Sequence, residues 1–280
     1  MQNGSRRPAR LLILLIVALA TTSLGFRCQG LSLLGFIELH RAGIDKYLGQ
    51  FTPATSEVQG EWTKHTFDTE DGDGPVCING TEFTVFTRAR DPEKVFFFLN
   101  GGGACWQNFY FCSQNATQSI PAGIGGIFAE SFDTGSEVID NPFADWSMVL
   151  VSYCDGSVHS GDNDVIDPVY GSAFGIDPPI RRHRGLRNLS AAMDLAKAEF
   201  PLARKLVVAG SSAGGVGATG FAPGLARFVF GNRTDLLVFN DAGPVSINPN
   251  DTAGIAARAA DWQFGQFYPC LLYTSPSPRD

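Results

Sequence analysis

A serine flanked by glycines has the surroundings in this chain that best fit covalent chemistry. Residues 210–214 read Gly-Ser-Ser-Ala-Gly and match the pattern G-x-S-x-G, with Ser212 at its centre. A β-branched apolar segment precedes the pattern and small residues follow it, as a tight turn from a strand into a closely packed helix requires. Such a turn exposes the serine hydroxyl, and the next backbone N–H, that of Ala213, faces the oxyanion of acyl transfer. A Gly/Ser turn without chemistry is the alternative.

A run of glycines supplies a second part of such a site. Residues 100–105 read Asn-Gly-Gly-Gly-Ala-Cys and directly follow a predicted strand. Acyl transfer needs at least two preorganised donors for the oxyanion, and many lipases and esterases place one on a glycine loop after an early strand. Three consecutive glycines cost conformational entropy, so a close backbone approach is favoured over a merely flexible turn.

A dinucleotide-binding motif competes for the same region. Residues 215–220 read Gly-Val-Gly-Ala-Thr-Gly and fit G-x-G-x-x-G, and Asp241 lies where a ribose-binding acid could fall. The first glycine, however, comes several residues after the predicted strand rather than at its tip. An oxidoreductase is therefore the less favoured alternative, and Asp241 is expected to be structural.

The histidines constrain the mechanism. An α/β-hydrolase triad runs in the order serine, acid, histidine. The chain has four histidines, and all of them precede Ser212: His40, His65, His159 and His183. Either the order is unusual or the catalytic histidine lies in a missing C-terminal part. The chain has no Cys-x-x-Cys pair and no Cys/His ligand spacing, so a zinc site is not expected.

Apolar runs, alternation and helical spacing of apolar residues predict the elements that hold these residues. Strands are expected over residues 81–88, 95–100, 147–153, 205–210 and 235–240, and amphipathic helices over 31–51 and 185–200. Strand and helix alternation is typical of an α/β fold with a mostly parallel sheet. The long polar stretch 155–184 is interpreted as a surface excursion or a cap over the carboxyl edge of the sheet.

The N-terminus and the sequons predict secretion. Three arginines precede a ten-residue apolar run, residues 11–20, which is typical of a signal peptide over residues 1–26 and too short for a membrane anchor. Five N-x-[ST] triplets are candidate glycosylation sites: Asn79, Asn115, Asn188, Asn232 and Asn250. The formal net charge of −7 argues against a nucleic-acid partner.

The C-terminus does not read as native sequence. Residues 270–280, Cys-Leu-Leu-Tyr-Thr-Ser-Pro-Ser-Pro-Arg-Asp, can be encoded by a transposon-type sequencing adapter. We expect the natural chain to break near Pro269, so that residues 27–269 form one truncated domain. Five cysteines then count as genuine, and in a secreted protein they should be mostly paired: Cys28, Cys77, Cys105, Cys112 and Cys154.

Six blocks, taken in order, carry a family resemblance. They are Phe-Leu-Asn-Gly-Gly-Gly-Ala-Cys-Trp (98–106), Asn-Pro-Phe-Ala-Asp-Trp (141–146), Tyr-Cys-Asp-Gly (153–156), Arg-Gly-Leu-Arg-Asn-Leu (184–189), Gly-Ser-Ser-Ala-Gly-Gly (210–215) and Asp-Ala-Gly-Pro (241–244). Together these blocks resemble the pectin acetylesterase family, which includes the Notum carboxylesterases.

The resemblance implies an α/β-hydrolase fold with helices on both faces of a mostly parallel sheet, here incomplete at the C-terminus. It implies secretion and cleavage of carboxylic esters without a cofactor. Ser212 would be the nucleophile, with oxyanion N–H groups from Gly102, Gly103 and Ala213. The implied disulfides are Cys105–Cys112 and Cys77–Cys154. The family's acid and histidine would follow the end of this chain, so the fragment itself is expected to be inactive.

The resemblance leaves the substrate open. Members of the family act on acetyl groups of pectin and other polysaccharides, or on a palmitoleoyl group of a signalling protein. An acylated carbohydrate is the first expectation, and a lipidated protein is the alternative. A non-catalytic binding protein is a third possibility. No stable membrane insertion is expected after signal cleavage.

Overall fold

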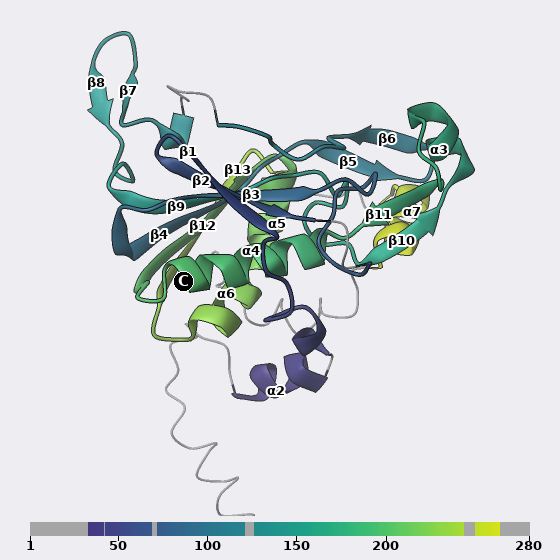
Figure 1. Cartoon of the computed structure of the whole chain (residues 1–280), viewed down its shortest axis with the longest axis horizontal. Helices are drawn as coiled ribbons and strands as arrows, with labels where there is room; N and C mark the ends of the chain where they lie inside the picture. Colours follow the sequence, from purple (N-terminus) through teal and green to yellow (C-terminus); the bar gives the residue numbers. More distant parts are fainter. Residues whose placement is uncertain (1–32, 42, 69–71, 121–125, 244–249, 264–280) are drawn as a thin grey trace, which may run out of the picture.

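The computed structural model describes residues 33–41, 43–68, 72–120, 126–243 and 250–263 (Figure 1). The expected signal peptide, Cys28 and the expected adapter-derived tail lie outside the described residues.

A seven-stranded mixed sheet forms the centre of the molecule, in the order β1-β2-β3-β9-β4-β12-β13. Strands β9, β4, β12 and β13 are parallel to one another, and β1, β2 and β3 extend the sheet in antiparallel pairing. The bounds are β1 (Thr55–Gln59), β2 (Trp62–Phe67), β3 (Phe83–Arg88), β4 (Asp91–Leu99), β9 (Trp146–Val151), β12 (Lys205–Ser211) and β13 (Asp235–Asp241). The α/β class and its parallel core are thereby confirmed.

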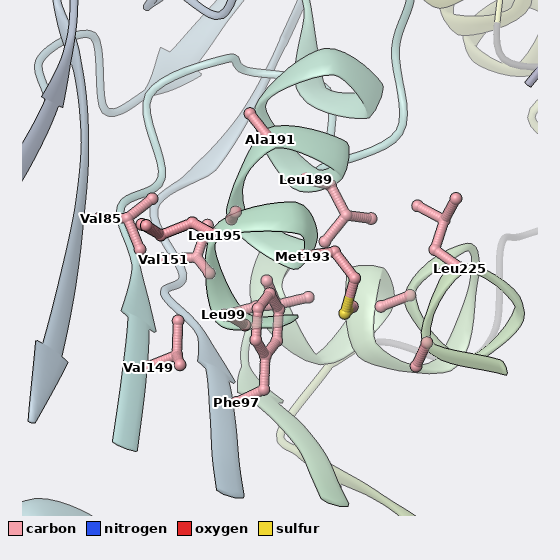
Figure 2. Packing of buried hydrophobic residues seen from close by; sticks show 14 of the residues in the cluster. Val85, Phe97, Leu99, Val149, Val151, Leu189, Ala191, Met193, Leu195 and Leu225 are labelled. Carbon is pink, nitrogen blue, oxygen red and sulfur yellow. The ribbon is translucent and has the colours of Figure 1, made fainter. Parts of the chain in front are cut away.

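The parallel strands are apolar because helices and loops cover both of their faces. One face packs against α4 (Gly185–Glu199), α5 (Ala213–Thr219) and α6 (Ala222–Phe230). Figure 2 shows Phe97 and Leu99 of β4 facing Leu189 and Met193 of α4 across this core. The predicted stripe of residues 185–200 therefore forms the expected helix, and it buries that stripe against the sheet.

A second apolar cluster lies on the other face of the sheet. Phe86, Phe96 and Leu150 project from three neighbouring strands into it. The segment that contains the 3₁₀ helix η2 (Gly126–Phe128) packs over them, and Phe128 meets Phe98 edge to face at 5.4 Å between ring centroids. The hairpin of β7 (Ser131–Asp133) and β8 (Val138–Asp140) extends from this segment.

Several smaller elements gather at one end of the sheet, the end at which β4 leads into the next hairpin (Figure 1). They are the hairpin of β5 (Gly103–Trp106) and β6 (Phe109–Cys112), the arm of β10 (Asn163–Ile166), α3 (Pro168–Phe174) and β11 (Ile180–His183), and α7 (Thr252–Trp262). Sequence patterning predicted none of these as regular elements.

The polar stretch 155–184 is not simply a surface excursion. Arg181 is buried and donates to Asp167 at 2.8 Å and to Asp261 of α7 at 2.9 Å. Asp155 and His183 are also buried. The interpretation as a surface excursion was wrong here because these polar groups satisfy one another inside the protein instead of facing water. The alternative, a cap at the carboxyl edge of the sheet, agrees with the position of β10, α3 and β11 (Figure 1).

The predicted helix over residues 31–51 is broken. The structure has α2 (Leu33–Arg41) followed by the 3₁₀ helix η1 (Ile44–Lys46). Gly43 lies between them with φ 87°, a left-handed conformation that ends a helix readily at glycine.

Candidate active site

Ser212 occupies the turn between β12 and α5. Its φ of 54° and ψ of −119° form a backbone conformation that side-chain-bearing residues rarely adopt. The residue is exposed, whereas Ala213 directly after it is buried as the first residue of α5. A strained strand-to-helix turn that displays a serine is the geometry expected of the G-x-S-x-G pattern.

Gly210 and Gly214 allow the backbones of β12, α5 and the end of β4 to pack closely beside Ser212. A Cβ on Gly210 would lie 2.2 Å from the carbonyl oxygen of Gly214. A Cβ on Gly214 would lie 2.0 Å from the carbonyl oxygen of Leu99, at the end of β4. Neither position accepts a side chain without displacement of the backbone, so the glycines fix how tightly the turn packs.

The glycine loop lies directly against this turn. Leu99 pairs in register with Gly210, which brings Asn100 and Gly101 beside the end of β12. A Cβ on Gly101 would lie 2.5 Å from the carbonyl oxygen of Ser211 and 2.9 Å from the Cβ of Ser212. The predicted close approach of the glycine run therefore occurs, and it occurs at the candidate nucleophile.

Main-chain groups of β13 support the turn from the opposite side. The N–H of Ser212 donates to the carbonyl oxygen of Asp241 at 2.9 Å. This bond fixes Ser212 through the Asp241 main chain.

The dinucleotide-binding alternative does not fit the structure. Gly215 and Gly217 lie inside α5 and Gly220 caps its C-terminus, so they do not form a turn at the tip of a strand. A Cβ on Gly215 would lie 2.3 Å from Asn240 Oδ1, which explains this glycine by packing alone.

Tyr153, to which the sequence analysis gave no role, holds the glycine loop. It is buried after the end of β9, and its hydroxyl donates to the carbonyl oxygen of Gly103 at 2.7 Å. Burial raises the pKa of its phenol well above the ordinary value, with a further contribution from Asp155, so the hydroxyl keeps its proton. A Cβ on Gly102 would lie 2.5 Å from the Tyr153 ring. The only available signal was its place in the Tyr-Cys-Asp-Gly block.

The structure has two disulfides among the described residues, and both expected pairings are confirmed. Cys105–Cys112 joins the two strands of the hairpin that continues the glycine loop. Cys77–Cys154 connects the segment before β3 to the segment after β9. Gly103 begins the hairpin that Cys105–Cys112 closes, and the assignment of Gly102 and Gly103 as oxyanion donors stays a prediction.

The histidines are engaged elsewhere. His65 on β2 bonds to Thr87 at 2.9 Å, and His40 lies 2.7 Å from Asp45. His183 is buried, with its ring nitrogens on Arg181 and on the carbonyl oxygen of Asp155.

Burial of the ring and the charge of a neighbouring residue both change the pKa of His183. Desolvation first, and then the charge of Arg181, lower its pKa to about 4. His159 is also buried, and its Nε2 lies 2.9 Å from the carbonyl oxygen of Asn100.

The sequons differ in accessibility. Asn188 is buried in α4 and its amide donates to the carbonyl oxygen of Val76 at 3.0 Å, so a glycan there does not fit this fold and that expectation is corrected. Asn115, Asn232 and Asn250 are exposed. Asn79 is half-buried, and its amide donates to Asn115 at 3.2 Å.

Among the described residues, no group of three or more His, Cys, Asp or Glu side chains is placed to hold a metal ion. Within the same residues, no helix has the length and apolar character needed to cross a membrane.

Comparison with known proteins adds a family. The family model described as Pectinacetylesterase matches residues 57–258, which is more than half of the chain. No curated protein sequence matches. Among solved structures, the chain is similar to the Wnt deacylase Notum from Drosophila at 16% sequence identity and a TM-score of 0.46. That match covers 71% of this chain and 59% of the Notum chain, so this chain spans about three fifths of that structure's length.

Proposed function

Because this chain belongs to the pectinacetylesterase family, we propose that it is a secreted serine carboxylesterase that removes O-acetyl groups from a polysaccharide such as pectin. The observation that carries the proposal is Ser212, an exposed serine on a strained turn with the glycine loop packed against it. Its Oγ attacks the ester carbonyl, and N–H groups of Gly102, Gly103 and Ala213 stabilise the oxyanion. The sugar hydroxyl leaves, and water then releases acetate from the acyl-enzyme.

We place the remaining triad members, an acid and a histidine, beyond this chain. Serine is a weak nucleophile until a base removes its proton. His159 and His183 are buried and bonded to main-chain oxygens, which supports a base from elsewhere. Sequencing the native transcript past the codon for Pro269 tests this. A transcript that encodes residues 270–280 and then stops would refute the truncation.

Secretion is supported by the two disulfides. Disulfides persist in oxidising compartments and are rare in the cytosol. Cys77–Cys154 joins segments that are 77 residues apart in sequence, and Cys105–Cys112 lies in the hairpin that continues the glycine loop. The family supports an acetyl ester as the substrate. The net negative charge of the chain argues against a nucleic acid as partner.

Hydrolysis of p-nitrophenyl acetate by the full-length secreted protein tests the function. Ser212→Ala should lose nearly all turnover because the covalent step depends on its Oγ. Ser211→Ala is the matched control, since it removes the same hydroxyl one residue earlier and should retain turnover. Activity that survives Ser212→Ala would refute the assignment.

Substrate class is tested with acetylated pectin and with esters of increasing acyl length. Release of acetate from pectin, with p-nitrophenyl acetate preferred over the octanoate and palmitate esters, is the expected result. A preference for the long esters would instead favour deacylation of a lipidated protein. Binding of pectin without release of acetate would favour a non-catalytic role.

A further inference from the structure

His159 lies between the two elements that form the candidate site. Its Nε2 is 2.9 Å from the carbonyl oxygen of Asn100, the residue that joins β4 to the glycine loop. Its Cβ faces α5, because a Cβ on Gly217 would lie 3.0 Å from it. One fully buried side chain thus contacts both the loop before Gly101 and the helix after Ser212.

The hydrogen bond to Asn100 determines the protonation of the ring. A carbonyl oxygen only accepts, so Nε2 of His159 carries the proton and donates. Burial lowers the pKa of the imidazole, while the nearby Asp155 acts in the opposite direction. His159 is therefore the neutral Nε2–H tautomer. Its Nδ1 is buried and has no hydrogen-bond partner among the described residues.

The backbone at this position is itself strained. Val158 has φ 51° and His159 has φ 60°, so two consecutive residues with side chains lie in the left-handed region. The conformation is unfavourable for a β-branched residue such as Val158. Strain of this kind persists where surrounding contacts over-determine it, and it clusters at functional sites.

We propose that His159 is a positioning residue for acyl transfer, whose Nε2–H holds Asn100 and thereby sets the glycine loop against Ser212. The inference rests on the proposed esterase function. His159 is not the general base, because its ring is buried and its Nε2–H is committed to Asn100, whereas Ser212 is exposed. It acts through the loop, where a displacement of about 1 Å can cost about 100-fold in rate.

Three substitutions at His159 in the full-length protein separate the hydrogen bond from packing. His159→Phe keeps a ring but removes the donor. His159→Asn tolerates the left-handed backbone but is too short to reach Asn100. His159→Gln places an amide N–H near the position of Nε2 and should restore the bond. His65→Phe, which changes a buried histidine on β2, is the matched control.

With p-nitrophenyl acetate, the Phe and Asn variants should lose roughly 10- to 100-fold in kcat with KM within about 2-fold of wild type. A trifluoromethyl ketone that forms an oxyanion adduct with Ser212 should bind more weakly by a similar factor. The Gln variant should recover most of both quantities. Unchanged kcat in Phe and Asn, or reduced kcat with unchanged ketone affinity, would overturn the proposal.

Hydrogen exchange provides a readout that does not depend on turnover. Peptides covering residues 98–104 should exchange faster in His159→Phe than in wild type or His65→Phe. If wild type shows no serine-dependent turnover but this difference is present, the proposed function fails, while the hold of His159 on the glycine loop stands. Equal exchange in all three proteins would overturn the positioning role.

Discussion

Gly101 is the residue at which the smallest change should have the largest effect on activity. In Gly101→Ala, the added methyl would lie 2.5 Å from the carbonyl oxygen of Ser211 and 2.9 Å from the Cβ of Ser212. The loop and the nucleophile must then move apart. We expect a loss of about 100-fold or more in kcat/KM for p-nitrophenyl acetate.

Gly72→Ala is the matched control, since nothing lies within 4 Å of the added Cβ and no positive φ opposes it. It should retain wild-type activity. Full activity in Gly101→Ala would mean that the glycine loop does not need its close approach to Ser212.

His183 should make stability depend on pH. Its pKa is about 4 in the folded protein, lowered by burial and by Arg181, against about 6.5 when unfolded. The unfolded chain therefore binds a proton between these values while the folded protein does not. The full contribution is present above pH 6.5 and is lost as pH falls from 6.5 towards 4, on the order of 2–3 kcal/mol.

Urea unfolding at pH 7.5, 5.5 and 4.5 measures this dependence. Wild type should lose unfolding free energy steadily across the series, and His183→Asn should lose less, because asparagine does not titrate. The two proteins should differ most in slope between pH 6.5 and 4.5. Identical slopes would contradict the assignment of a neutral, buried His183.

The two disulfides should contribute differently, one more to stability and the other more to activity. Cys77–Cys154 closes a loop with a sequence separation of 77. Cys105–Cys112 closes a loop with a sequence separation of 7. Loop-closure entropy then predicts that removing the first disulfide lowers the free energy of unfolding by about 4.5 kcal/mol, and that removing the second lowers it by about 2.5 kcal/mol. Replacing each pair by serine and measuring urea unfolding and p-nitrophenyl acetate turnover tests this.

The short disulfide should matter more for catalysis, because it borders the glycine loop. At a temperature where both double variants are folded, the Cys105/Cys112 variant should show the lower kcat. A larger loss of kcat in the Cys77/Cys154 variant would contradict this division. Non-reducing peptide mapping of wild type should show both linkages.

The strands of the parallel core were predictable from sequence because they are buried on both faces. The expectations for 95–100 and 205–210 differ from β4 and β12 only at their ends. The candidate nucleophile was predictable because glycines flank it, and these glycines are needed for close backbone packing. The constraint on Gly210 is local, because an added Cβ would meet the carbonyl oxygen of Gly214, whereas an added Cβ on Gly214 would meet the carbonyl oxygen of Leu99 in β4.

The other elements depend on partners distant in sequence. β1 carries mostly exposed residues and forms by pairing with β2, so its own pattern is weak. The buried polar arm resembled a surface loop because Arg181 is neutralised by Asp261, 80 residues away. The role of His159 was equally hidden, since Asn100 lies 59 residues before it.

Among the described residues, β13 is an edge strand of the sheet and carries exposed apolar side chains. Leu237 and Phe239 of β13 are 57% and 62% exposed. They stand in register beside Val207 and Ala209 of β12, which are buried on the same face. An exposed edge strand with apolar side chains favours association between chains.

We therefore expect residues 27–280 expressed alone to aggregate and to lack turnover, and the full-length protein to be soluble and active. Light scattering and p-nitrophenyl acetate hydrolysis, measured side by side, check this. Leu237→Thr together with Phe239→Thr should reduce aggregation of the fragment without giving it activity. Serine-dependent turnover by the fragment would overturn the truncation, because the expected triad acid and histidine would then not be needed.

Covalent labelling tests most directly the claim that Ser212 is the nucleophile. The full-length protein is treated with a fluorophosphonate, which reacts with serines that a base activates, and is then digested and analysed by mass spectrometry. We predict one phosphonylated residue, Ser212, in the peptide that contains residues 210–214. A label on Ser211 or on another residue, or no label on a protein that hydrolyses p-nitrophenyl acetate, would contradict the account.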